Sequence, residues 1–470
     1  MGGDPPAILV VSRSGHPRAA LYGGKHGPVY SADGATRASG RPALRNITSL
    51  ETDRCKEVPM TRRAHAPSSF AFPLRLSHWM KGFALALPLF GNPAFAQDAS
   101  AGPAGGVYNL LVGTYTGSGS DGIYVYRFDT DSGRATPVSS AKTENPSYLV
   151  ASRDGRHVYA VNELPGDAGP ASVRGGVSAF DFDAKTGALK FVNRVSSEGN
   201  DPCYLSLSPD GRYLVAANYS VASDPGGSFS VFPVEATGAL GAAVLNVHHE
   251  GSGPVKGRQD GAHVHSTVFS PDGKYLFVQD LGVDKLYSYR YTPDGSRGLI
   301  GPTESRYTLV KAGSGPRHLV FSANGRFAYV TNELNASLDV YRYDDGRLAH
   351  VETVPMTAPG FAGKVGGGAL HLSPDGRFLY ATNRGDANDI VIYAVNAADG
   401  KLKLVGRQSS LGKTPREFAI DPSGKWLIVG NQDSDSVFVF RRDVASGRLE
   451  PNPAQIKIDK PVDFKFVPVQ

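Results

Sequence analysis

Histidine, arginine and carboxylate side chains recur near the ends of two similar stretches of this chain. His263 and His265 lie at the start of the first stretch and Asp280 at its end, while Arg317 opens the second stretch and Glu333 closes it. A neutral imidazole can take a proton from water near pH 7. A guanidinium can bind an anion through two parallel hydrogen bonds, or stabilise an oxyanion that forms on a carbonyl group. These residue types predict activation of water for attack on a small polar substrate.

Each stretch is predicted to be a β-hairpin that carries these side chains at its open end. Two short apolar segments flank a Ser-Pro-Asp-Gly turn at residues 270–273 in the first stretch and a Ser-Ala-Asn-Gly turn at 322–325 in the second. Glycine, asparagine and aspartate supply the positive φ angles that a tight turn requires. Because the turn closes one end of the hairpin, we expect the ionisable residues to be neighbours at the other.

The same turn recurs and divides the chain into repeats. Six turns end at glycines 48 to 62 residues apart, namely Gly155, Gly211, Gly273, Gly325, Gly376 and Gly424. Four antiparallel strands in about 50 residues is the size of one propeller blade. Residues 110–115 and 122–128 resemble the second and third strands of a seventh blade, and residues 461–468 resemble its missing first strand. We therefore predict an all-β fold over residues 106–470, a seven-bladed β-propeller of four-stranded antiparallel blades, with the ring closed by the N-terminal strands and the C-terminal strand.

In such a propeller the open ends of all the hairpins surround one mouth of the central channel. The predicted catalytic residues at this mouth are His263, His265, Arg317 and Glu333. The predicted substrate-binding residues are Arg384, Arg258, Asp280, Asn218 and Glu163. Several charged side chains at one concave mouth fit a small anionic ligand.

These assignments have structural alternatives. The two histidines face the same side of a strand and could instead cap a turn, or bind zinc with Asp280 as a third ligand. Arg317 and Glu333 could form a salt bridge across the hairpin end, with Glu333 orienting the guanidinium.

Other candidates are expected to be structural. His318 is predicted to pack inside its blade, and His248 and His249 are predicted to lie in an exposed loop between blades. Cys203, the only cysteine after residue 96, is expected to be a small buried residue. No internal disulfide or cysteine metal cluster is therefore expected.

The first hundred residues differ from the rest in charge. The net charge is +5, but residues 1–96 hold 12 Lys/Arg and 5 Asp/Glu, which leaves 37 basic and 39 acidic side chains in the remaining 374 residues. This distribution argues against a nucleic-acid partner. Residues 80–90 combine a basic start with an apolar run too short to span a bilayer, and Ala-Phe-Ala at 94–96 matches a signal-peptidase site.

From these features we predict three segments. Residues 1–59 are expected to be disordered or to precede the true translation start, and residues 60–96 to form a signal-peptide region cleaved near Ala96. The mature protein is expected to be periplasmic and monomeric, with no membrane association after cleavage.

Six segments carry a resemblance to a known family, namely 111–116, 258–259 with 263–266, 280–284, 315–318, 332–334 and 383–385. As a set they resemble the seven-bladed β-propeller lactonase family over residues 106–470, which includes a bacterial type of 6-phosphogluconolactonase and the fungal 3-carboxy-cis,cis-muconate lactonizing enzymes.

The resemblance implies an enzyme that opens a sugar lactone without a metal or cofactor. It places one histidine of the 263/265 pair, Arg317, Glu333 and Arg384 at catalytic or substrate-binding positions. The alternatives are a cycloisomerase that forms a lactone from a muconate-like diacid, and a propeller scaffold without catalytic activity.

Overall fold

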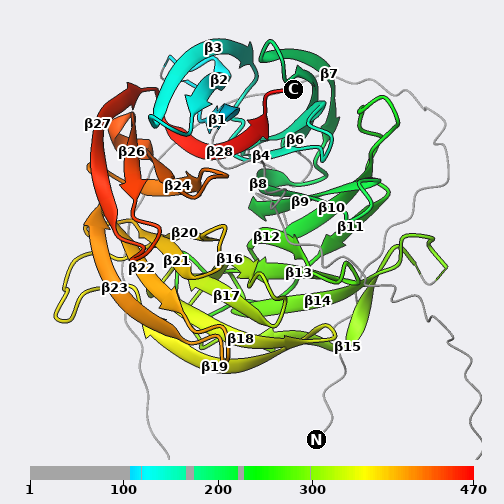
Figure 1. The fold of residues 1–470 in the computed structure, drawn as a ribbon. Helices are drawn as coiled ribbons and strands as arrows, with labels where there is room; N and C mark the ends of the chain where they lie inside the picture. The colour runs from blue at the N-terminus through cyan, green and yellow to red at the C-terminus, as the bar shows by residue number, and fades with distance from the viewer. Residues whose placement is uncertain (1–105, 118, 166–173, 221–226, 297) are drawn as a thin grey trace, which may run out of the picture. The chain divides into compact units, whose positions relative to one another are not determined.

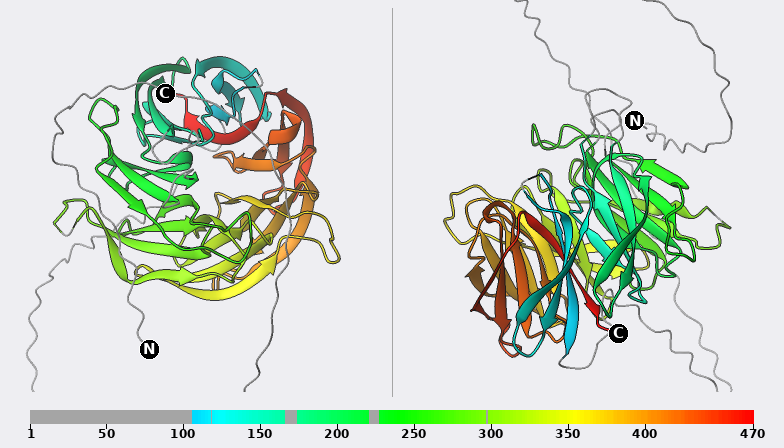
Figure 2. Two further views of the ribbon diagram at one scale, coloured as in Figure 1. Left: turned by 180° about the vertical axis from the view of Figure 1, so that it is seen from behind. Right: turned by 90° about the horizontal axis from the view of Figure 1, so that it is seen from above.

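The computed structural model describes residues 106–117, 119–165, 174–220, 227–296 and 298–470. These residues form seven four-stranded antiparallel sheets, arranged as blades around a central axis (Figures 1 and 2). The predicted seven-bladed propeller is confirmed. The predicted leader and signal region, residues 1–96, lie outside the described residues. The short 3-10 helix η1 (Gln432–Ser434) is the one helix in the described part of the chain, and no helix there is long and apolar enough to cross a membrane.

Each blade has four strands that follow one another outward from the axis. The innermost strands are β28 (Pro461–Pro468), β4 (Leu149–Ala151), β8 (Asn200–Leu207), β12 (Val264–Phe269), β16 (Pro316–Phe321), β20 (Gly367–Leu372) and β24 (Pro415–Ile420). The second strands are β1 (Val107–Thr114), β5 (His157–Asn162), β9 (Tyr213–Ser220), β13 (Tyr275–Asp280), β17 (Phe327–Asn332), β21 (Phe378–Asn383) and β25 (Trp426–Asn431). The third strands are β2 (Gly122–Asp129), β6 (Gly176–Asp183), β10 (Ser228–Pro233), β14 (Lys285–Tyr291), β18 (Ser337–Asp344), β22 (Asp389–Val395) and β26 (Ser436–Arg442). The outermost strands are β3 (Arg134–Lys142), β7 (Ala188–Ser196), β11 (Leu245–His248), β15 (Ile300–Leu309), β19 (Arg347–Pro355), β23 (Leu402–Ser409) and β27 (Leu449–Lys457).

A repeated hydrogen-bond pattern shapes the turn between the first and second strands. The hydroxyl of Ser270 donates to Oδ1 of Asp272 at 2.5 Å and accepts from the backbone N–H of Tyr275 at 3.0 Å. Gly273 has a φ of 69°, a conformation that side chains disfavour. The serines at 208, 322 and 373 make the same two kinds of contact. Each turn therefore sets the pairing of the first and second strands. The opposite, open end of each hairpin lies at the mouth of the central channel.

Apolar packing between neighbouring blades holds the ring together. Seven buried clusters of described residues lie one at each blade interface. The innermost strands also contact one another in an unbroken cycle, from β28 through β4, β8, β12, β16, β20 and β24 back to β28. Residues that project from these strands toward the axis therefore meet residues of other blades.

The ring is closed by strands from the two ends of the described chain. β28 pairs with β1 in antiparallel orientation, with Phe464 opposite Val112, as predicted. At the interface with the neighbouring last blade, Nε1 of Trp426 donates to the carbonyl oxygen of Thr130 at 2.8 Å. This pairing covers the edge that β1 would otherwise leave open, and β28 becomes the innermost strand of the blade.

We expect Trp426→Ala to lower the free energy of unfolding by about 3–5 kcal/mol, because it opens a cavity at the closing interface. Urea unfolding followed by circular dichroism measures the loss. Phe191→Ala is the control, because Phe191 is 55% exposed, and it should change the free energy by no more than about 0.5 kcal/mol. Equal effects of the two substitutions would contradict the importance of this interface.

Candidate active site

β-Bulges at the open ends of the innermost strands set the direction of several side chains. In β12 the bulge leaves His265 without a partner residue in β13. The same irregularity leaves Arg317 unpaired in β16, Arg416 in β24 and Cys203 in β8. A bulge interrupts the ladder locally and redirects the side chain of the extra residue. His265 and Arg317 therefore hold equivalent positions in neighbouring blades.

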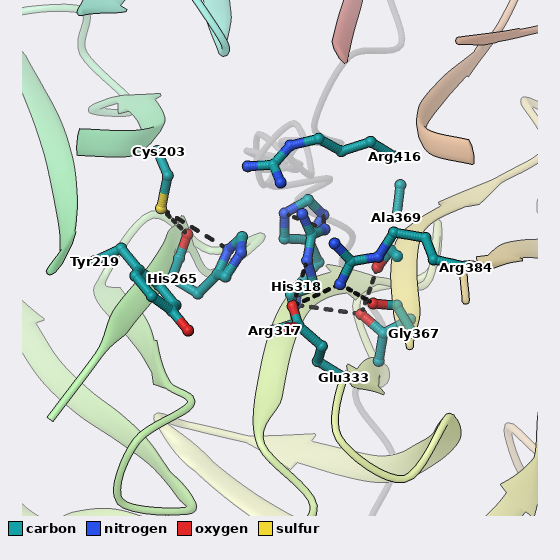
Figure 3. A network of polar contacts seen from close by, with 12 residues as sticks. Cys203, Tyr219, His265, Arg317, His318, Glu333, Gly367, Ala369, Arg384 and Arg416 are labelled. Atoms are coloured by element: carbon teal, nitrogen blue, oxygen red, sulfur yellow. Dashed lines mark hydrogen bonds and ion pairs between the residues drawn. The ribbon is translucent and has the colours of Figure 1, made fainter. Parts of the chain in front are cut away.

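Glu333, which follows β17, binds three guanidinium groups. Its Oε2 lies 3.2 Å from Nε of Arg317 and 2.7 Å from Nη2 of Arg384 (Figure 3). Its Oε1 forms an ion pair with Nη2 of Arg258. Burial alone would raise the pKa of this carboxyl, but Arg384 and Arg317 hold the pKa of Glu333 well below its usual range. Glu333 therefore stays ionised, which suits an orienting partner better than a proton donor.

Arg317 is a buried cation among other cations. Its side chain is 2% exposed, and burial together with Arg384 and Arg416 lowers its pKa to about 10. Its Nε binds Glu333, and its Nη1 lies 3.0 Å from Nε2 of His318. Nη2 has no hydrogen-bond partner among the described residues and is available to a ligand.

His265 lies buried beside these groups. Its Nδ1 is 4.0 Å from Sγ of Cys203, and its ring centroid is 5.5 Å from that of Tyr219 and 5.2 Å from that of His318. Burial and the charge of Arg317 lower the pKa of His265 well below 6.5. At neutral pH His265 is therefore an uncharged imidazole, the form that can accept a proton. Cys203 is buried, as predicted.

His263 also packs against the Tyr219 ring. The two rings stack with centroids 4.6 Å apart, and Nδ1 of His263 lies 2.8 Å from the carbonyl oxygen of Tyr219. Since a carbonyl oxygen only accepts, Nδ1 carries the proton in the neutral ring and Nε2 has the lone pair. The structure thus brings both predicted histidines against one tyrosine, with His265 the more deeply buried.

Glu163 belongs to a second charged group at the mouth. Its Oε1 lies 3.6 Å from Nη2 of Arg416 and accepts a hydrogen bond from the hydroxyl of Tyr115 at 2.7 Å. The Arg416 guanidinium lies 5.3 Å from the centre of the Tyr115 ring. Figure 3 shows that Arg416 points into the same space as Arg317 and Arg384.

His318 contacts residues of other blades. Its ring centroid lies 5.2 Å from that of Tyr204, which belongs to β8, and 6.4 Å from that of Tyr148, which precedes β4. The expectation that His318 packs inside its own blade is therefore wrong. It lies at the propeller axis, where the innermost strands bring their side chains together.

Asp280 and Asn218 are not brought into the cluster around Glu333. Both side chains are fully buried. Asp280 accepts a hydrogen bond from Nδ1 of His249 at 2.8 Å, and Nδ2 of Asn218 donates to the carbonyl oxygen of Ser197 at 3.0 Å. The prediction that His249 is exposed is wrong, because Asp280 and the hydroxyl of Tyr289 enclose its ring.

An offset of one residue along the second strands explains why Asp280 and Asn218 lie outside the cluster around Glu333. A fully buried polar residue lies near the end of every second strand, namely Thr114, Asn162, Asn218, Asp280, Asn332, Asn383 and Asn431. In five blades the next residue lies in the site, because successive side chains on a strand point to opposite sides; these residues are Tyr115, Glu163, Tyr219, Glu333 and Arg384. Sequence analysis did not assign Tyr115 or Tyr219 to the site. Alignment of the second-strand ends one residue further on would have found the two tyrosines.

The contacts of Asp280 also bear on the zinc alternative. Its Oδ1 accepts the backbone N–H of His263 at 2.8 Å, while Oδ2 binds His249. Within the part of the chain that the structure describes, no group of three His, Cys, Asp or Glu side chains is placed to hold a metal ion.

Comparisons with known proteins agree with this architecture. Residues 109–466 match the family described as lactonase, 7-bladed beta-propeller. A 6-phosphogluconolactonase of Formosa agariphila is 36% identical over 353 residues, which cover 74% of this chain and 97% of the relative. A 6-phosphogluconolactonase of Bacillus subtilis is 33% identical over 363 residues, which cover 77% of this chain and 98% of the relative.

Among solved structures, a periplasmic gluconolactonase of Pseudomonas aeruginosa superimposes with a TM-score of 0.74 at 45% sequence identity. The match covers 78% of this chain and 100% of the other. The chain therefore belongs to the seven-bladed β-propeller lactonase family, and the resemblance found in the sequence is confirmed.

Glu333→Gln is expected to lower the free energy of unfolding by about 3–5 kcal/mol at pH 7, because it leaves buried guanidiniums without their counter-ion. The folded-state pKa of Glu333 is depressed, so its stabilising contribution is present above the unfolded-state pKa and is lost as the pH falls through the folded-state pKa. The difference between wild type and variant should therefore shrink below about pH 4.5.

Urea unfolding at pH 7 and at acidic pH measures this difference. Glu304→Gln is the matched control, because the Glu304 side chain is 89% exposed in its ion pair with Arg347, and exposed pairs contribute little. A Glu333→Gln variant as stable as the wild type at pH 7 would disprove the counter-ion role.

Proposed function

We propose that this chain hydrolyses a sugar lactone to the open hydroxy acid, as a carboxylic-ester hydrolase of the 6-phosphogluconolactonase type. The proposal depends on one observation above all: the uncharged imidazole of His265 lies buried beside the Arg317 guanidinium, at a mouth lined by further arginines. Relatives named 6-phosphogluconolactonase and a solved gluconolactonase, matched over nearly their whole lengths, support the same reaction.

In this reaction a histidine of the 263/265 pair takes a proton from water while the water oxygen attacks the lactone carbonyl carbon. The carbonyl oxygen becomes an oxyanion, which Nη2 of Arg317 is free to stabilise. Collapse of the intermediate breaks the ring C–O bond. The protonated histidine then returns its proton to the departing alkoxide, and water is the only reactant added.

His265 is the better-supported base. Burial lowers the pKa of His265, and the charges of Arg317, Arg416 and Arg384 lower it further. An anionic substrate would bind to these same arginines. A bound anion offsets the charge of Arg317, so the proton affinity of His265 rises when substrate is present. His263 is the alternative, because its Nε2 lone pair lies on a partly exposed ring.

The charge of the mouth favours an anionic substrate or product. The guanidiniums of Arg258, Arg317, Arg384 and Arg416 face two carboxylates, Glu333 and Glu163. The excess positive charge suits a phosphate on the sugar or the carboxylate that the reaction creates. We assign Glu333 to orienting these arginines and Arg384, Arg258 and Arg416 to binding the anion.

Turnover by site variants tests the proposal. We expect glucono-δ-lactone or its 6-phosphate to be hydrolysed in a pH-stat assay, and His265→Ala and Arg317→Ala each to lower kcat/KM about 100-fold or more. His263→Ala should have the smaller effect of the two histidine variants. His350→Ala is the control, because His350 lies on the outermost strand β19 with its side chain 52% exposed.

Two outcomes would contradict lactone hydrolysis. Turnover of 3-carboxymuconate alone would favour a cycloisomerase, in which the same arginines bind the carboxylates. No turnover of any of these compounds, with the biological activity kept in His265→Ala and Arg317→Ala, would favour a binding scaffold.

We further propose that the protein acts in the periplasm. The signal region predicted at residues 60–96 supports this location, as does the 45% identity to a periplasmic gluconolactonase. Cell fractionation with mass spectrometry of the mature protein should find it in the periplasm with Gln97 at its N-terminus. Uncleaved protein in the cytoplasm would disprove the export.

A further inference from the structure

The proposed reaction uses Arg258, which does not belong to a strand of the propeller. It lies in the loop of residues 250–262, which connects β11 in one blade to β12 in the next. Its Nη2 forms an ion pair with Oε1 of Glu333 and lies 3.3 Å from the hydroxyl oxygen of Tyr219. Its side chain is 46% exposed, whereas those of the other three arginines at the mouth are at most 17% exposed. Arg258 is therefore the most exposed of the four, and its position depends on the loop that carries it.

Gln259 anchors this loop to the end of β13. Its side chain is fully buried. Its Nε2 donates to the carbonyl oxygen of Leu281, which follows β13, at 2.8 Å, and its Oε1 accepts the backbone N–H of Val255 at 3.1 Å. The backbone N–H of Leu281 donates in turn to the carbonyl oxygen of His263 at 2.9 Å. The Gln259 amide thus uses a donor and an acceptor to join the loop to the hairpin that carries His263.

The backbone of the loop forms a tight turn that includes both the anchor and the arginine. The backbone N–H groups of Arg258 and Gln259 donate to the carbonyl oxygen of Val255, at 3.1 and 2.8 Å, and the N–H of Gly253 donates to the carbonyl oxygen of Gln259 at 2.8 Å. A β-carbon at Gly253 would lie 2.5 Å from Oε1 of Gln259, closer than a β-carbon can come, so glycine leaves the room that the amide occupies. Since Arg258 directly precedes Gln259, the anchor fixes where the arginine side chain begins.

We propose that Gln259 is a positioning residue that holds Arg258 at Oε1 of Glu333, where Arg258 binds a phosphate or carboxylate group of the ligand. Gln259 is fully buried and acts through Arg258 without contacting the ligand. A guanidinium that is held in place binds an anion more tightly, because less loop and side-chain entropy is lost on binding. This inference rests on the proposed lactone hydrolysis and deepens it, because it names the residue that brings the most exposed guanidinium to the mouth.

Gln259→Met tests this role, because methionine fills a similar volume without the two hydrogen bonds. We expect the KM for 6-phosphogluconolactone, or the inhibition constant of D-gluconate, to rise about tenfold. The value of kcat should fall less than about threefold, because Arg258 binds the anion in the ground state and the transition state alike. A rise in KM identifies a phosphate as the bound group, and a rise confined to the inhibition constant identifies the carboxylate of the product.

A double variant separates this role from general damage to the fold. If Gln259 acts only through Arg258, Gln259→Met should change these constants less than about twofold in a protein that already carries Arg258→Gln. Lys256→Gln is the matched control, because it removes a charge from an exposed side chain in the same loop, and it should leave the constants within about twofold. Equal effects of Gln259→Met with and without Arg258→Gln, or no effect in the wild-type background, would overturn the proposal.

A crystal structure of Gln259→Met gives a result that does not depend on turnover. We expect Arg258 to lose its ion pair with Glu333 in this variant. If Gln259→Met does not fold, Gly253→Ala displaces the same amide and should give the same result. An ion pair that is kept in the folded variant would overturn the positioning role. Absence of lactone turnover in the wild type, with the ion pair lost in the variant, would instead overturn only the proposed reaction.

Discussion

The pairing of β28 with β1 is the constraint on which the whole mouth depends. Tyr115 follows β1 in the first blade and Arg416 lies in the last one, yet the Arg416 guanidinium stands 5.3 Å from the Tyr115 ring. Such contacts exist only if the ring is closed. The apolar clusters between blades stabilise the closed ring. The innermost strands contact their neighbours all the way round, so their side chains meet at the axis. The site is therefore a property of the closed ring and not of any one blade.

Charge balance is the second organising feature. Two unit charges 4 Å apart interact by about 4 kcal/mol at an effective dielectric constant of 20, so several guanidiniums at one mouth require a counter-ion. Glu333 supplies it for Arg317, Arg384 and Arg258. One carboxylate does not neutralise three guanidiniums, and the charge that remains is what an anionic ligand can neutralise.

The fold could be predicted from the sequence because its signals are local and repeated. Each Ser-Pro-Asp-Gly turn specifies its own hairpin, and the turns at Gly211 and Gly273 use the same serine contacts. The closing strand could be predicted because one blade lacked its first strand. His265, Arg317, Glu333 and Arg384 could be found because ionisable residues are rare at apolar strand ends.

The remaining site residues could not be predicted, because their positions depend on β-bulges and on contacts between residues distant in the sequence. A bulge changes which side of a strand a residue faces, and a shift of one residue exchanges the buried position of Asn218 for the mouth position of Tyr219. His249 and His318 were misplaced for a related reason. Their surroundings come from residues distant in the sequence, such as Asp280 and Tyr204.

The excess of guanidiniums at the mouth has a consequence for inhibition by the product. The carboxylate that ring opening creates carries the charge that the arginines bind, so product that accumulates would compete with the lactone for the mouth.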